Sequence, residues 1–146
     1  MPSISRYINV ISRCGNMYRN ERLKGTDLGT SHHTYLFTIC RNPGISQEKL
    51  ARMIYINKSN VTRQLSALEQ NGFISRRCSP EDRRIMQVFP TEKAEALYPK
   101  VVELMKHWNR LLLEDFSEEE QNLLLDMMQR VQAKAALLAE EEEQKR

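Results

Sequence analysis

The chain has 146 residues, of which 40% are hydrophobic and 28% are charged, which is the composition of one soluble globular domain. No stretch approaches the roughly 18 uncharged apolar residues of a membrane span, and residues 1–14 lack the pattern of a secretory signal. Three cysteines without CxxC spacing argue against a disulfide framework or a zinc knuckle. We therefore expect a cytoplasmic protein with no membrane contact.

The net charge of +3 conceals two segments of opposite charge. Residues 1–113 carry 18 Lys and Arg against 9 Asp and Glu, whereas residues 114–146 carry 4 against 10. Within the basic segment, residues 52–84 have 7 basic and 3 acidic residues. Such a local excess is typical of a surface that binds a polyanion, although a solvated charged surface has the same composition.

Apolar residues recur at helical spacing over residues 4–22, which predicts the first helix. Glycine, threonine and aspartate in residues 24–30 indicate a loop. Ser31 is then expected to cap a helix that runs to about Cys40. The side chains predicted to face inward on this helix are Tyr35, Leu36 and Ile39.

Two further N-cap residues divide the next segment into two short helices. Ser46 is expected to cap a helix over residues 47–53, and Asn57 is expected to cap a second helix over residues 58–70. Gly72 ends the second helix by supplying a left-handed residue. The apolar side chains of the second helix follow the i, i+4, i+7 pattern and are Val61, Leu65 and Leu68.

The apolar period then changes from 3.6 residues to 2 residues. Residues 73–78 and 85–89 are predicted to form two strands of an antiparallel hairpin, joined by a turn over residues 79–84. Two long helices follow, the first opening at Pro90-Thr91 and the second at a capping box of Ser117 and Glu120. Both have apolar residues spaced 4, 3, 4, 3.

Two short helices joined by a tight turn and followed by a hairpin describe a winged helix-turn-helix. We expect a mostly α chain with a small antiparallel β-hairpin (α+β), in which terminal helices flank the winged helix-turn-helix. Because the two long helices carry more apolar surface than a winged helix covers, we expect the terminal helices to form a homodimer, with packing of these helices on each other as the alternative. The expected parts are an N-terminal dimerisation helix (1–22), a DNA-binding domain (31–90), C-terminal dimerisation helices (91–139) and a fraying charged tail (140–146).

The second short helix is the candidate reading helix, because the N-terminal part of such a helix meets base edges and its free N–H groups attract phosphate. Asn60 suits adenine and Arg63 suits guanine. An ordinary amphipathic helix is the alternative, but residues 57–66 contain no carboxylate. The predicted DNA-binding residues on this helix are Lys58, Ser59, Asn60, Thr62 and Arg63.

The turn of the hairpin is the candidate wing tip. Arg83 and Arg84 suit the negative potential of a neighbouring minor groove. Asp82 would be repelled by phosphate, so we interpret it as a partner that orients one of these arginines. A solvated turn is the alternative.

The runs GISQEKLARMIYINKSNVTRQLSALEQNGFISRR and PEDRRIMQVFPTEKAEAL resemble the MarR family of bacterial and archaeal transcription regulators. The resemblance covers residues 31–113, and its most specific part is the Asp-Arg-Arg wing followed by Thr-Glu-Lys. It implies a homodimer that binds a pseudo-palindromic operator in double-stranded DNA, usually as a repressor. It also implies release by a small phenolic or other anionic ligand, or by cysteine oxidation.

Such an effector pocket is expected between the winged-helix body and the dimerisation helices. The residues on elements that would line it are Tyr7, Arg13, Tyr18, His32 and Tyr35, with packing at an interface as the alternative role for each.

Other chemistry is weakly represented in the sequence. Cys14 lies on the first helix, where some family members sense peroxides, but its surroundings (RCGNMY) favour a packing role for it and for Cys40 and Cys78. Adjacent His32 and His33 point about 100° apart on a helix and do not chelate together, so we expect no metal and no cofactor. No catalytic arrangement is recognisable, so we expect no enzyme. The rival from another class is a winged-helix module that binds protein or RNA.

Overall fold

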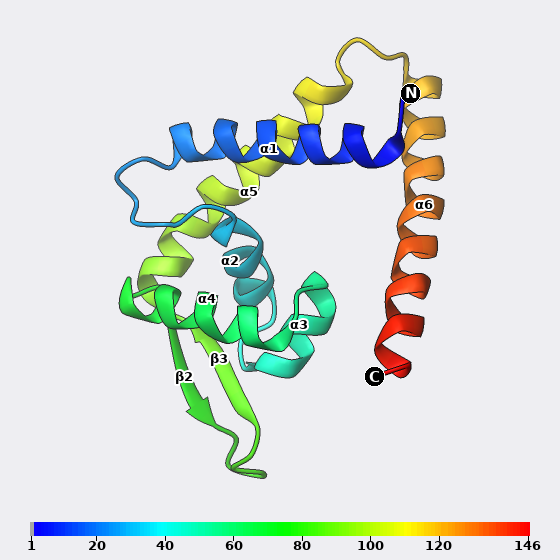
Figure 1. Ribbon diagram of the computed structural model, residues 1–146. Helices are drawn as coiled ribbons and strands as arrows, with labels where there is room; N and C mark the ends of the chain where they lie inside the picture. The colour runs from blue at the N-terminus through cyan, green and yellow to red at the C-terminus, as the bar shows by residue number, and fades with distance from the viewer. Residues whose placement is uncertain (1) are drawn as a thin grey trace. The chain divides into compact units, whose positions relative to one another are not determined.

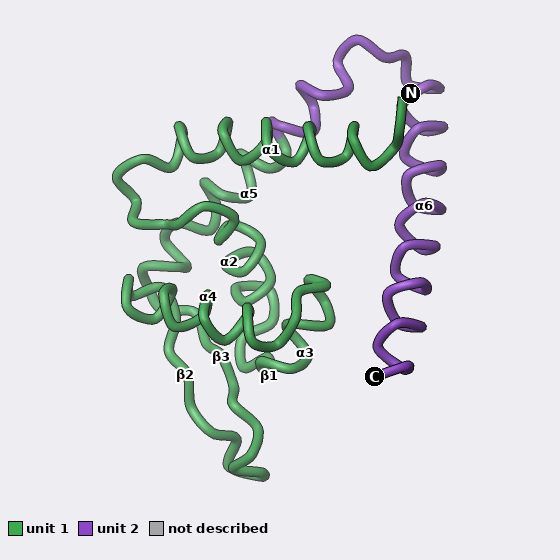
Figure 2. Tube along the Cα trace, viewed as in Figure 1, with its two compact units in different colours: residues 1–106 green, residues 107–146 purple. Residues whose placement is uncertain are grey.

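The computed structural model describes residues 2–146 and is shown in Figure 1. Its elements are α1 (Ile4–Arg22), α2 (His32–Arg41), β1 (Ile45–Ser46), α3 (Gln47–Ile54), α4 (Lys58–Gln70), β2 (Ile74–Cys78), β3 (Met86–Pro90), α5 (Glu92–Leu113) and α6 (Glu118–Gln144). The chain forms two compact units, residues 1–106 and residues 107–146, which divide within α5 (Figure 2). The mostly helical fold with a small antiparallel sheet is confirmed. Within residues 2–146, no helix is long and apolar enough to cross a membrane.

The ends of α3 and α4 follow from side-chain caps. The Ser46 hydroxyl accepts a hydrogen bond from the Lys49 amide at 3.1 Å, and the Asn57 side chain accepts one from the Asn60 amide at 2.8 Å. Each bond satisfies an amide that the first helical turn leaves without a partner. Gly72 has a φ of 81°, so α4 ends at a left-handed residue as predicted.

Two predictions about helix ends are wrong. Ser31 stands before α2 but has a φ of 66° and makes no capping bond, because its hydroxyl instead donates to Asn16 Oδ1 at 3.4 Å. Residues 140–144 belong to α6 and do not form a frayed tail. Glutamate is a strong helix former, and each added residue gains a backbone bond once a helix is nucleated.

The sheet has one strand that the sequence analysis missed. The strand order is β1-β3-β2, all antiparallel, with Ile45 paired to Val88 and Arg76 also paired to Val88 from the other side. Two residues are too few to show a period, so β1 is recognisable only from its pairing. The β2–β3 hairpin extends beyond the helices of residues 1–106 (Figure 1).

The core of residues 1–106 fixes the orientation of α4. Val61, Leu65 and Leu68 are buried as predicted, with at most 1% of each exposed, and they pack in one cluster with residues of α2, α3, β2 and β3. A helix that buries this stripe must turn its opposite side outward. The predicted inward side chains of α2 are buried in the same cluster and are Tyr35, Leu36 and Ile39.

The first and last helices bury few of their side chains within the chain. Gly15 is the only buried residue of α1, and α6 has none among the described residues. Their exposed apolar side chains include Tyr7, Ile8 and Ile11 on α1, and Leu123, Met127 and Leu137 on α6.

His33 makes stability depend on pH. Burial lowers the pKa of His33 from 6.5 to about 4, and the positive charges of Arg19 and His32 add to this effect. His33 therefore binds its proton near pH 6.5 in the unfolded chain but only near pH 4 in the folded chain. Because the unfolded chain binds more protons between these values, the free energy of unfolding falls as pH drops through this range. Urea unfolding at pH 7.5 and at pH 4.5 measures how much the free energy of unfolding falls between these values. We expect this fall to be roughly 2 kcal/mol smaller in His33→Gln. The exposed His107→Gln is the control, and an unchanged loss in His33→Gln would contradict this account.

Candidate nucleic-acid interface

The first turns of α4 present the predicted reading face. Lys58, Ser59, Thr62 and Arg63 are exposed, and Asn60 is half-buried. Local bonds order this face: the Ser59 hydroxyl donates to Asn57 Oδ1 at 2.9 Å, and the Thr62 hydroxyl donates to the Lys58 carbonyl at 2.9 Å. The Arg63 side chain has no hydrogen-bond or ion-pair partner among residues 2–146, so its planar fork of N–H donors is available to a ligand.

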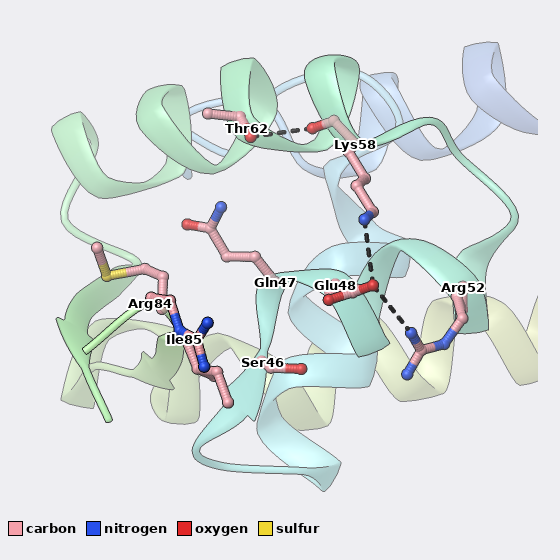
Figure 3. A pocket seen from close by; sticks show the side chains of 9 residues that line it. Ser46, Gln47, Glu48, Arg52, Lys58, Thr62, Arg84 and Ile85 are labelled. Carbon is pink, nitrogen blue, oxygen red and sulfur yellow. Dashed lines mark hydrogen bonds and ion pairs between the residues drawn. The ribbon is translucent and has the colours of Figure 1, made fainter. Parts of the chain in front are cut away.

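An open groove of about 450 Å³ connects the start of α4 with the wing (Figure 3). It brings Lys58 and Thr62 of α4 to the same depression as Arg84 of the hairpin, three of the residues that the sequence analysis selected. The complete lining is Ser46, Gln47, Glu48, Arg52, Lys58, Thr62, Arg84, Ile85 and Met86.

Glu48 places a carboxylate in this otherwise basic groove. Its Oε1 lies 3.1 Å from Lys58 Nζ and 3.4 Å from Arg52 Nη1 (Figure 3). The hydrogen bond from Lys58, then the charges of Lys58 and Arg52, lower the pKa of Glu48. The Glu48–Arg52 pair has the i, i+4 spacing that can be read from a helix, but the contact with Lys58 depends on how α3 and α4 pack, and sequence reasoning missed it.

The two arginines of the wing tip differ: Asp82 binds Arg84 but not Arg83. Asp82 accepts three hydrogen bonds from Arg84: from its amide at 3.0 Å, from Nε at 3.1 Å and from Nη2 at 3.1 Å. These side-chain and backbone bonds lower the pKa of Asp82. Arg83 is exposed and has no hydrogen-bond or ion-pair partner within the described part of the chain.

Arg76 joins the wing to the two short helices, a role that sequence reasoning also missed. From β2 its guanidinium donates to Gln47 Oε1 of α3, and to Ser66 Oγ and Glu69 Oε1 of α4, each at 3.2 Å. Its side chain is only 18% exposed, so these bonds are partly shielded from water. They fix the angle between the hairpin and α4.

The expected pocket residues are spread over α1 and α2. Tyr7 and Arg13 are exposed, and Tyr18 is half-buried with the Arg22 guanidinium 3.6 Å above its ring. Eleven residues of helix separate Tyr7 from Tyr18, roughly 16 Å. His32 and Tyr35 are buried and in edge-to-face contact, with ring centroids 5.9 Å apart.

The packing role predicted for the cysteines holds for Cys40 only. Cys40 packs against the core, and burial followed by the charge of Glu95 raises its pKa to about 11. Cys14 and Cys78 are exposed in the protomer, because their positions on α1 and β2 face away from the core. Within residues 2–146 no three His, Cys, Asp or Glu side chains lie close enough to hold a metal ion.

Comparison with known proteins decides the family. The MarR family model matches residues 29–86. The chain is 34% identical over 131 residues to the HTH-type transcriptional regulator YybA of Bacillus subtilis, covering 90% of this chain and 87% of that protein. The chain belongs to the MarR family.

Solved structures agree with this assignment. The crystal structure of the transcriptional regulator SlyA is 32% identical and superposes with a TM-score of 0.91, covering 95% of this chain and 98% of that one. A MarR-family regulator from Listeria monocytogenes, crystallised with a 26mer DNA, is 33% identical with a TM-score of 0.87 and covers 95% and 93%. This MarR-family chain is therefore a DNA-binding transcription regulator with a winged helix-turn-helix, and not an enzyme.

Removing the carboxylate from the groove of this MarR protein should strengthen DNA binding. Glu48 repels phosphate and competes with it for Lys58, so Glu48→Gln is expected to raise affinity for random-sequence duplex roughly fivefold at low salt. Titration by fluorescence anisotropy measures this, with Glu21→Gln as the control because Glu21, near the end of α1, forms a similarly exposed pair with Lys24 of the following loop. Weaker binding by Glu48→Gln would mean that Glu48 positions Lys58 for phosphate.

Proposed function

We propose that this MarR-family regulator is a cytoplasmic homodimeric repressor that binds a pseudo-palindromic operator and is released by a small phenolic or anionic ligand. The observation that carries the DNA-binding part is the juxtaposition of the carboxylate-free start of α4 with an arginine-bearing wing across one groove. A repressor of this kind acts by occupying duplex DNA that the transcription machinery needs.

The start of α4 is the element proposed to enter the major groove. Its exposed residues are short or cationic and stand where a reading helix meets base edges. Arg63 is the proposed guanine contact, because its unpartnered guanidinium matches the two acceptors of guanine. Lys58 and Ser59 lie at the helix N-terminus, which also suits phosphate. The proposed reading residues are Lys58, Ser59, Asn60, Thr62 and Arg63.

The wing is proposed to act on the neighbouring minor groove. Among the described residues, Arg83 has no partner that would keep it out of the minor groove. Asp82 holds Arg84 at the edge of the protein groove between α4 and the hairpin. Minor-groove edges distinguish bases poorly, so the wing contributes through charge and groove width.

The dimer is proposed from the two helices that bury least. α6 has 27 residues and none of them is buried in the protomer, although leucine and methionine recur along it. α1 exposes a similar row of isoleucine and tyrosine side chains. A stable monomer rarely leaves such surfaces in water, and a second copy of the chain supplies a matching apolar surface. Two-fold symmetry then places two reading helices on half-sites about 34 Å apart.

An effector site is proposed around α2, where polar atoms are buried without partners. His32 Nδ1, the Tyr35 hydroxyl and Arg19 Nε have no hydrogen-bond partner within the described residues. A phenolic acid carries a hydroxyl and a carboxylate that match such groups. Tyr7, Arg13 and Tyr18 lie on the helix that precedes α2 and are proposed as further contacts.

The guanine contact is tested with Arg63→Ala. If Arg63 pairs with a base, the substitution should cost roughly 1–3 kcal/mol on the selected operator and flatten preference at one position. Affinity for competitor duplexes that vary at each position measures both effects. Equal weakening on every sequence would assign Arg63 to phosphate.

The wing is tested by replacing Arg83 and Arg84 together with alanine. Operator and non-specific affinity should fall together, and the dependence of log affinity on log salt should become shallower by about 1–2 per subunit. Asp82→Ala is the companion variant: it removes a negative charge, yet it should weaken binding because Arg84 loses its fixed orientation. Tighter binding by Asp82→Ala would contradict the orienting role.

A further inference from the structure

A hydrogen-bond chain leads from the buried start of α2 to the reading face of α4. His32, which is 6% exposed, has its Nε2 2.6 Å from Gln64 Oε1. Gln64 Nε2 then donates to Asn60 Oδ1 at 3.2 Å, one helical turn towards the start of α4. Asn60 is thus connected to the interior of the domain through a single glutamine.

The direction of this hydrogen-bond chain follows from the orientation of the Gln64 amide. Because the amide nitrogen of Gln64 donates to Asn60, its carbonyl oxygen faces His32 and requires a donor there. His32 must therefore carry a proton on Nε2. In the neutral ring this leaves Nδ1 as the acceptor, and Nδ1 is the buried atom without a partner.

The same direction determines what Asn60 offers to a ligand. Its Oδ1 is engaged by Gln64, and its backbone amide is engaged by Asn57. The Nδ2 group, with two N–H donors, has no partner within the described residues. The unengaged donors that Asn60 presents to a ligand are thus the two N–H groups of Nδ2. This disfavours the adenine pairing expected from the sequence, because that pairing also uses Oδ1.

Gly29 leaves room for the ring of His32, the first member of this hydrogen-bond chain. A Cβ at Gly29 would lie 2.7 Å from His32 Nδ1 and 2.9 Å from His32 Cε1, both closer than real contacts allow. The His32 ring is buried and packed edge-on against Tyr35, so it cannot move aside freely. A side chain at position 29 would therefore displace a ring that contacts Gln64 of α4.

We propose that the His32–Gln64–Asn60 hydrogen-bond chain is a specificity-determining relay, which fixes the amide of Asn60 so that it selects a base with a carbonyl oxygen in the major groove over a base with an amino group at that position. Guanine and thymine present O6 and O4 there, whereas adenine and cytosine present an amino group at the matching edge. His32 and Gln64 are positioning residues, and Asn60 is the contact. The inference rests on the proposed function, since it requires that Asn60 meets a base.

The test uses the full-length protein and operators selected from a random duplex pool. Asn60→Ala first identifies the position that Asn60 reads, as the one where base preference disappears. Gln64→Met should then flatten preference at that same position, from roughly tenfold for G or T over A or C to near onefold. Added to Asn60→Ala, it should change nothing further. Gln70→Met makes the same substitution on an exposed glutamine of α4 and is the control.

Two more variants separate the relay from a general loss of structure. Gln64→Glu can only accept hydrogen bonds, so Asn60 should turn its nitrogen inward and its oxygen outward, and preference should shift to A or C. Gly29→Ala should flatten the same position by displacing His32, without a change on α4.

Each failure has a separate meaning. If Asn60→Ala leaves every position unchanged, base reading by Asn60 is wrong, and the relay fails with that part of the proposed function. If Asn60→Ala flattens one position but Gln64→Met, Gln64→Glu and Gly29→Ala keep the wild-type preference there, the relay alone is overturned. Uniform weakening on all sequences by the Gln64 variants would likewise reduce Gln64 to a structural role.

Discussion

Burial of Val61, Leu65 and Leu68 is the constraint on which the rest of the interface depends. These side chains occupy one stripe of α4 and at most 1% of each is exposed, so the helix cannot rotate without exposing them to water. The opposite side must then face outward, and it is the side without carboxylates. An apolar interaction in the core thus sets the orientation of the polar side chains that are proposed to meet DNA.

Polar contacts refine the position that this burial sets. Arg76 connects the hairpin to both short helices through three side-chain hydrogen bonds. Within the wing, Asp82 orients the guanidinium of Arg84 through two hydrogen bonds. Arg84 is thus held in place before DNA arrives, which reduces the side-chain entropy that this arginine loses on binding. Glu48 works against this basic surface, because it neutralises part of the charge beside Lys58.

The sequence predicts α4 well because its signals are local: Asn57 caps it, an apolar stripe runs along it and Gly72 ends it. It predicts β1 and the partners of Glu48 poorly, because these arise from pairing and packing between segments distant in the chain. The hydrogen bond between Gln64 and Asn60 depends both on local spacing and on packing between distant segments. The i, i+4 spacing is visible in the sequence, but the direction of the bond depends on His32, which tertiary packing brings beside it. The predicted cap at Ser31 is wrong for a similar reason: its hydroxyl donates to Asn16 of α1, a contact that depends on packing between two helices.

We propose that two copies of this chain present two such faces to one duplex. Selection of binding sites from a random duplex pool, followed by footprinting of the enriched sequences, tests it most directly. If two copies bind together, the enriched sequence is an inverted repeat with half-site centres about one helical turn apart, roughly 34 Å, and both halves are protected. Enrichment of a single asymmetric half-site, protected on one side only, would contradict it.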